Sequence, residues 1–283
     1  MTDSYLQIEP VVDSMPLEPM SELEQELRRR LDTGRAALPV LPHVAASALK
    51  LAADQRANVE ELARLVDTDP PIAARFLSVA NSAIYWRGFN ASTTQAAIVR
   101  LGLARTRDLL FQIVYANTTV GLKRYQAVVR DSFDRSVRCA VAARVVSSRL
   151  GLPQELDYMS GLLHDIGEAR IYRIFDGLQI KPEQKKELHQ LVQRYHCRAG
   201  AEVAMAWHLP PEIVDACAAH HDDSSKDSPH VRLVMLADTL VDSLVAPQLE
   251  RFAFLGVDEV SAQALIEGYR DAQRSSMRAR ARS

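Results

Sequence analysis

The sequence contains few cysteines, few aromatic residues and no long hydrophobic run. Its three cysteines, Cys139, Cys197 and Cys217, are an odd number without a CxxC pair, which argues against a disulfide scaffold and is typical of a reducing cytoplasm. Aromatic residues make up 6% of the chain, whereas Ala, Leu and Val are abundant, so helix is favoured over sheet. Because no apolar run approaches ~18 residues and the acidic N-terminus lacks an apolar segment, we expect neither a membrane span nor a signal peptide.

The chain also lacks a strong net charge. The formal net charge of its 283 residues is −2, so the overall balance does not indicate binding to nucleic acid or to an anionic membrane. Arg28, Arg29 and Arg30 are interleaved with glutamates, a pattern that indicates a solvated helix with ion pairs. The other basic cluster is the C-terminal segment 274–283, which we interpret as a solvated end. We therefore do not expect a nucleic-acid partner.

Helix-capping signals recur along the chain. Ser21 and Glu24 have the spacing of a capping box, Asn58 can cap a second helix, and Asp69 precedes two prolines at a further start. Apolar periodicity predicts additional helices at 93–102, 130–150, 154–165, 182–207, 211–221, 228–247 and from about 258 onward. Without an internal repeat or a convincing strand, the sequence predicts an all-α fold.

The helical pattern loosens around 119–131, which indicates a seam between two helical halves. The sequence accordingly divides into a disordered leader at 1–20, an N-terminal helical subdomain at 21–125, a second helical subdomain at 126–270 and a flexible basic tail at 271–283.

The histidines are unevenly distributed. None lies between residues 44 and 163, whereas seven of the eight lie within 164–230. Histidine and aspartate side chains from several helices can converge on one cation, so this cluster is a candidate metal site. In "YMSGLLHDIGEARIY" (158–172), His164 stands beside Asp165 at the end of an apolar helical run. Taken alone, this pair could instead serve as a helix cap, with His164 bonding carbonyls and Asp165 bonding loop amides.

Several ordered segments resemble the HDOD family, the non-catalytic relatives of the HD and HD-GYP phosphohydrolases in bacterial signalling. They cover roughly residues 30 to 240 and read "LPVLPHVAASALKLAAD", "VEELARLVDTDPPIAARFLSVANSAIY", "STTQAAIVRLGLARTRDLL", "SGLLHDIG" and "AGAEVAMAWHLPPEIVDACAAHH". The resemblance implies an all-α fold in which an N-terminal helical subdomain packs on an HD-like helical bundle.

The resemblance also implies a degenerate HD site. The residues that match the metal ligands of the HD superfamily are His164, Asp165, His196, His220, His221 and Asp238. The first histidine of that set has no counterpart, because its place falls on Arg135 in a helix that contains no histidine at any register.

Arg135 shares a helical stripe with the apolar positions Cys139, Ala142 and Val146. A buried guanidinium is costly unless it is paired, so we expect Arg135 to pair with Asp165 and Asp238 in place of the missing cation. A solvent-facing Arg135 is the alternative. We expect no metal or other cofactor. A residual divalent-metal site stays open as a second alternative, with the ligands Asp165, His196, His220 and His221.

For function, the resemblance implies a cytoplasmic regulatory module that acts by protein–protein interaction without chemistry, with signalling proteins of cyclic-di-GMP, stress or motility pathways as candidate partners. Tyr85, Trp86 and Phe89 form a candidate interface, unless these rings pack under their loop. The alternative function is a metal-dependent HD-type phosphohydrolase that acts on a nucleotide or cyclic dinucleotide. The "EGYRD" at 267–271 lacks the proline of a GYP motif, which argues against that alternative.

Overall fold

The computed structural model describes residues 20–33, 47, 58–82, 85–118, 121–154, 156–181 and 184–280. Within these residues the regular structure is helical and no strand occurs, in agreement with the predicted all-α fold. No helix among them is both long and apolar enough to cross a bilayer. The expected leader, except for Met20, and the "LPVLPHV" segment lie outside the described residues.

In the described part of the N-terminal subdomain, four helices follow one another between residues 59 and 118. They are α3 (Val59–Asp67), α4 (Pro70–Ala80), α5 (Thr94–Leu101) and α6 (Leu103–Thr118). The side chains of Asn58, Asp69 and Thr93 each accept a main-chain amide hydrogen bond at a helix start, as the capping signals predicted for the first two. The helices enclose a separate core that includes Leu62 and Phe76.

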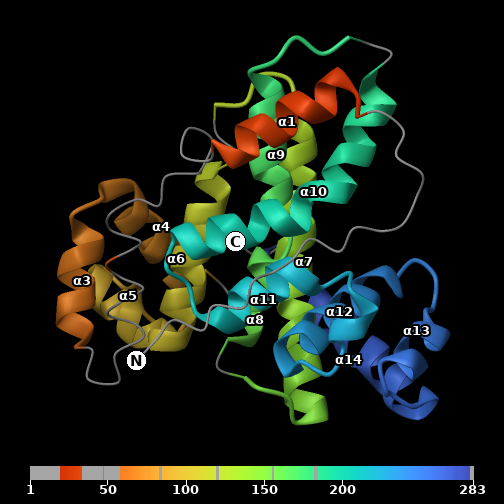
Figure 1. Ribbon diagram of the computed structural model, residues 1–283. Helices are drawn as coiled ribbons and strands as arrows, with labels where there is room; N and C mark the ends of the chain where they lie inside the picture. Colours follow the sequence, from red (N-terminus) through yellow and green to blue (C-terminus); the bar gives the residue numbers. More distant parts are fainter. Residues whose placement is uncertain are drawn as a thin grey trace, which may run out of the picture.

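The second subdomain is a larger helical bundle, with α7 through its centre (Figure 1). Its helices are α7 (Gln126–Leu150), α8 (Asp157–Leu163), α9 (Ile166–Asp176), α10 (Lys185–Ala206), α11 (Pro211–Ala219), α12 (Pro229–Asp242), α13 (Leu249–Phe254) and α14 (Glu259–Arg280). Helix α7 begins at Gln126, within the segment 119–131 that we interpreted as a seam from the sequence.

Two expectations about the ends of the chain differ from the structure. Helix α1 (Glu22–Asp32), which we assigned to the N-terminal subdomain, instead packs on α9 and α10 of the bundle through Leu23 and Leu27 (Figure 1). The segment expected to be a flexible tail is helical as far as Arg280, because α14 continues through it. Local sequence does not reveal which distant surface an amphipathic helix covers.

Two glycines allow the helices around the His-Asp motif to pack closely. A Cβ atom at Gly167 of α9 would lie 1.9 Å from the carbonyl oxygen of His196 in α10, and one at Gly161 of α8 would lie 2.8 Å from the Cα of Ala140 in α7. Only glycine permits backbones to approach this closely. This packing brings α10 against the start of α9 and so positions the histidine cluster.

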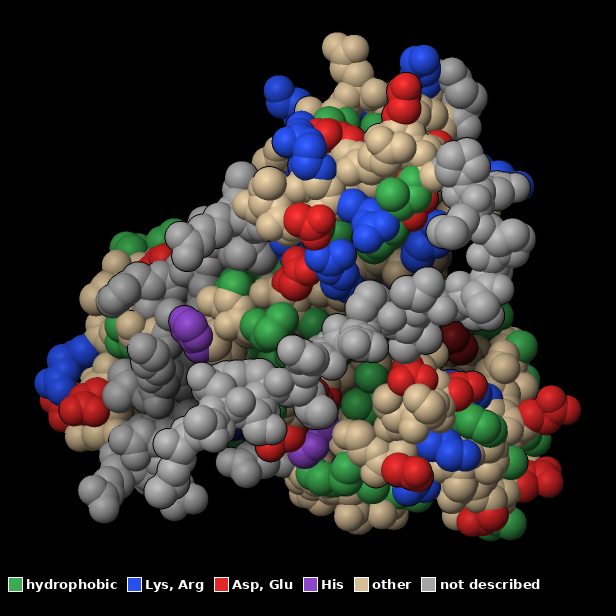
Figure 2. All heavy atoms as spheres, in the orientation of Figure 1, with side chains coloured by type: hydrophobic (Ala, Val, Ile, Leu, Met, Phe, Trp, Pro, Cys, Tyr) green, Lys and Arg blue, Asp and Glu red, His purple; other side chains and the backbone are tan. Residues whose placement is uncertain are grey.

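Charged side chains of both signs are interspersed on the described surface drawn in Figure 2. Near α1 several form ion pairs, such as Arg198 Nη2 with Asp32 Oδ1 at 2.5 Å and Arg194 Nη1 with Glu24 Oε1 at 3.0 Å. On this face, positive and negative side chains therefore neutralise one another locally.

Candidate functional site

The seven residues identified from the sequence come together at one place in the bundle. Arg135 comes from the middle of α7, and Asp238 comes from α12. The predicted helix at 154–165 ends earlier than expected, because α8 stops at Leu163 and α9 begins at Ile166. The break places His164 and Asp165 at the junction of the two helices. The remaining members are His196 on α10 and His220 and His221 directly after α11.

Three buried histidines share one tautomer. The Nδ1 atoms of His164, His196 and His220 each lie 2.9–3.0 Å from a main-chain carbonyl oxygen three or four residues earlier. A carbonyl can only accept a hydrogen bond, so each Nδ1 carries the proton and donates it. Each Nε2 therefore points away from its own helical segment. Histidines that bind metal through Nε2 are oriented in the same way.

All three Nε2 atoms face the Asp165 carboxylate. His164 Nε2 lies 3.0 Å from Oδ2, while His220 Nε2 and His196 Nε2 lie 3.2 and 3.5 Å from Oδ1. The Nε2 atoms of His196 and His220 are only 3.3 Å apart. With Nδ1 protonated, neutral imidazoles would direct lone pairs at one another and at the carboxylate, so this geometry requires either extra protons or a cation.

The pKa values show how protons would meet this requirement. Burial alone would raise the pKa of the Asp165 carboxyl, but the adjacent His164 and His220 lower it well below its usual range. Burial would lower the pKa of His220, but its hydrogen bond to Asp165 raises the value above normal. His221 differs. Its side chain reaches the surface, but desolvation by the surrounding protein atoms and the neighbouring His220 and His196 lower its pKa to about 4, so it is neutral at physiological pH.

Arg135 is directed toward the carboxylates of this site. Its Nη1 hydrogen-bonds Asp238, and its Nη2 lies 2.9 Å from Asp242 Oδ1. The contact to Asp165 is longer, at 3.8 Å between Nη1 and Oδ2. The Arg135 side chain is 31% exposed, so it is half-buried rather than enclosed. The sequence analysis did not identify Asp242, although this residue lies one helical turn after Asp238.

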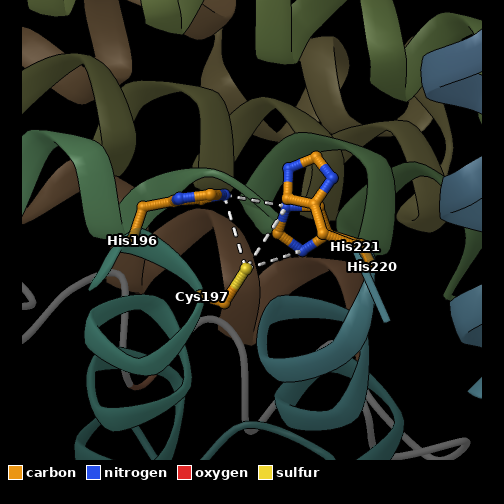
Figure 3. Close-up of side chains that lie close together, drawn as sticks. All are labelled: His196, Cys197, His220 and His221. Atoms are coloured by element: carbon orange, nitrogen blue, oxygen red, sulfur yellow. Dashed lines mark hydrogen bonds between the residues drawn. The ribbon is translucent and has the colours of Figure 1, made fainter. Parts of the chain in front are cut away.

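Among the described residues, three groups of side chains could each hold a metal ion. They are His196, Cys197, His220 and His221; Cys139, His164 and Asp238; and His164, Asp165 and His220. The last two groups contain Asp238 or Asp165, and the permanent positive charge of Arg135 beside these carboxylates disfavours a cation there. On the other side of the site, one donor atom each from His196, Cys197, His220 and His221 lies within 4.8 Å of all the others (Figure 3). Cys197 was absent from the sequence-based ligand set. In the sequence, the feature that could have identified Cys197 was its position directly after the candidate ligand His196.

A cavity of about 230 Å³ opens beside the site. Its lining residues are His220, His221, Met235, Asp238, Thr239, Asp242, Gln248 and Arg251. Small-molecule sites usually span about 300–1,000 Å³, so this cavity is small for a nucleotide. A larger cavity of about 530 Å³ lies away from the histidines, where Arg105, Arg107 and Arg144 line the boundary between the two subdomains.

The aromatic residues proposed as an interface behave differently from one another. Trp86 and Phe89 are 49% and 66% exposed, whereas Tyr85 is partly buried against the core of the N-terminal subdomain. Arg100 stacks on the Phe89 ring, with its guanidinium carbon 5.0 Å from the ring centre. Packing under the loop therefore applies to Tyr85, while Trp86 and Phe89 are accessible.

Comparison with solved structures shows the same fold in several other proteins. An HDOD domain protein of unknown function from Geobacter sulfurreducens superposes with a TM-score of 0.65 at 22% identity, covering 89% of this chain and 95% of that one. A protein from Shewanella amazonensis SB2B, provisionally described as a metal-dependent phosphohydrolase, gives 0.65 at 21% identity, covering 87% and 98%. A provisional signal transduction protein from Marinobacter aquaeolei VT8 gives 0.61 at 21% identity, covering 91% and 60%.

Sequence comparison relates the chain to part of a longer enzyme and to one domain family. Ribonuclease Y of Lactobacillus gasseri is 27% identical over 203 residues, which is 71% of this chain and 31% of the relative. The chain thus spans about a third of the length of that curated relative. The HDOD domain profile matches residues 38–223. Together with the ordered motifs and the shared helical fold, this match shows that the chain belongs to the HDOD domain family.

Proposed function

We propose that this protein is a cytoplasmic regulator of bacterial signal transduction that acts by binding protein partners and not by phosphoester hydrolysis. The observation that carries the proposal is the guanidinium of Arg135 among the carboxylates of Asp165, Asp238 and Asp242. Metal-dependent hydrolysis needs an ion that activates water and stabilises the leaving oxygen. A guanidinium stays protonated and cannot ligate metal, so it compensates the carboxylates without supplying that chemistry.

The surroundings of the site support the same proposal. The adjacent cavity of about 230 Å³ is small for a nucleotide or a cyclic dinucleotide. Membership of the HDOD family and the fold shared with a provisional signal transduction protein also favour a regulatory role. The provisional phosphohydrolase description of the Shewanella protein supports the alternative, an HD-type hydrolase, which has to be tested directly.

We propose the loop between α4 and α5 as the partner-binding surface. Trp86 and Phe89 are both exposed there, and aromatic residues contribute a disproportionate share of binding energy at protein interfaces. Signalling proteins of cyclic-di-GMP, stress or motility pathways are the first candidates for the partner.

Turnover measurements test the absence of catalysis. Wild-type protein supplied with Mn²⁺ should hydrolyse neither cyclic dinucleotides, nor nucleotides, nor a generic phosphodiester. Arg135→His restores the missing type of ligand and serves as the comparison. Metal-dependent turnover by the wild type that survives repurification would contradict the proposal.

Affinity capture from the native host tests the interaction surface. A partner captured by wild-type protein should be lost with the double variant Trp86→Ala and Phe89→Ala. Val260→Ala, an exposed apolar residue on α14, is the matched control and should retain the partner. Equal capture by all three proteins would exclude this loop as the interface.

A further inference from the structure

Two pairs of consecutive residues, each able to bind a metal ion, face each other where α10 packs against α11. His196 and Cys197 lie on α10, and His220 and His221 follow α11 (Figure 3). His196 and His220 are buried, whereas Cys197 is partly exposed and His221 is exposed. The cluster therefore has an inner face of fixed imidazoles and an outer face through which an ion could enter.

All four donor atoms lie within 4.8 Å of one another, and two of the distances between them match those of a tetrahedral zinc site. His196 Nε2 lies 3.3 Å from His220 Nε2 and 3.4 Å from Cys197 Sγ. Bonds of about 2.0–2.1 Å to nitrogen and about 2.3 Å to sulfur place tetrahedral ligands about 3.3–3.6 Å apart. Cys197 Sγ is 4.0 Å from His220 Nε2. A shift of a few tenths of an ångström would bring these two atoms to the separation of tetrahedral ligands as well.

We propose that His196, Cys197, His220 and His221 form a closed site for one zinc-class ion, with Cys197 as a thiolate ligand. A thiolate favours Zn²⁺ over Mg²⁺ or Mn²⁺, because soft donors discriminate against those harder ions. Four protein ligands leave no open position for water, as in structural rather than catalytic zinc sites. The site does not depend on the regulatory function proposed above, since metal content and turnover are measured separately.

The residues around the cluster are arranged to support an ion. The Nδ1 atoms of His196 and His220 donate to carbonyl oxygens of α10 and α11, which fixes both rings with Nε2 pointing inward. The Asp165 carboxylate, 3.2 Å from His220 Nε2, supplies negative charge beside the ion. An ion at this position would also satisfy the converging Nε2 lone pairs without additional protons, and would link α10 to α11.

Metal analysis of the full chain tests the site. Protein produced in zinc-supplemented medium and desalted should contain one zinc per chain. After replacement by Co²⁺, it should show the strong visible bands of a tetrahedral ion and a near-ultraviolet sulfur-to-cobalt charge-transfer band. Cys197→Ser should abolish the charge-transfer band and weaken zinc binding more than about tenfold. Cys197→Asp should keep the metal but lose that band.

Matched controls separate ligation from folding. Cys217→Ala removes a buried thiol outside the cluster, and His189→Ala removes an exposed histidine on the same helix. Both should retain the metal and the band. His221→Ala alters an exposed side chain and should weaken binding. The proposal is overturned if the wild type holds no zinc at micromolar concentrations or if cobalt gives no sulfur band. It is also overturned if Asp165→Asn removes the metal while His221→Ala leaves its affinity unchanged.

Discussion

The Nη1 atom of Arg135 lies 3.8 Å from Oδ2 of Asp165, beyond hydrogen-bonding distance. The guanidinium is held instead by two carboxylates one turn apart on α12, those of Asp238 and Asp242. Asp165 is therefore left to the three histidines, whose Nε2 atoms lie 3.0–3.5 Å from its oxygens. The site thus has two halves. In one, Arg135 neutralises the carboxylates of α12; in the other, three imidazoles surround the carboxylate of Asp165.

Removal of the guanidinium should destabilise the bundle. Arg135→Ala leaves Asp238 and Asp242 without their cation in a partly buried setting, and we expect the free energy of unfolding to fall by about 1–3 kcal/mol. Full burial would imply a larger loss, but the side chain is 31% exposed. Urea denaturation measures the change. Arg64→Ala, which removes an exposed ion pair with Glu60, should cost less than about 0.5 kcal/mol. Equal midpoints for the wild type and Arg135→Ala would mean that the pairing is unimportant.

The two α12 carboxylates should not contribute equally. The Asp242 side chain is 53% exposed, whereas that of Asp238 is 18% exposed. We therefore expect Asp242→Ala to cost less than about 1 kcal/mol and Asp238→Ala to cost more. The same denaturation experiment ranks them, and the reverse order would show that Arg135 depends mainly on the outer carboxylate.

Close packing at Gly167 should be intolerant of any side chain. Gly167→Ala would place a Cβ atom 1.9 Å from the His196 carbonyl oxygen, so α9 and α10 must separate. We expect a loss of about 2–4 kcal/mol, at or above the usual cost of overpacking because the obstacle is backbone. Gly177→Ala is the control, since its nearest atom would be 3.5 Å away and its φ is −82°. Thermal unfolding should show a large decrease in Tm for the first variant alone.

Asp176 should stabilise the protein above acidic pH. Its oxygens accept the amides of Lys123 at 3.0 Å and Arg124 at 2.7 Å, joining the segment before α7 to the end of α9. Slight burial raises the pKa of this carboxyl, but these hydrogen bonds outweigh it and lower the value below normal. A lowered pKa stabilises the folded state above the unfolded value of about 3.9, and the effect is lost as pH falls through the folded value.

The corresponding experiment compares Tm as a function of pH. Asp176→Asn should melt below wild type at pH 7, and the difference should shrink as the pH falls below about 4. Asp271→Asn, at an exposed position on α14, should follow the wild-type curve throughout. If the difference in Tm between Asp176→Asn and wild type were the same at every pH, the effect would come from side-chain packing and not from the charge of the carboxylate.

Much of the architecture follows from local sequence. The caps at Ser21, Asn58 and Asp69 act as predicted because a short polar side chain satisfies an amide only a few residues away. The same holds for the absence of strands among the described residues, given a composition rich in helix formers. By contrast, the predicted helix at 154–165 ends early, because the chain turns at His164 and Asp165 between α8 and α9. The same region packs closely on its neighbours through Gly161 and Gly167.

The sequence by itself determined the residue types available to the site, and the family resemblance implied that Arg135 takes the place of a histidine, since both are matters of residue identity and order. Only the tertiary structure decided that Asp242 shares the guanidinium, that α1 covers α9 and α10, and that Cys197 faces His220. These contacts join residues 23 or more positions apart. Their existence depends on how helices cross and how closely their backbones approach, and local periodicity does not encode that geometry.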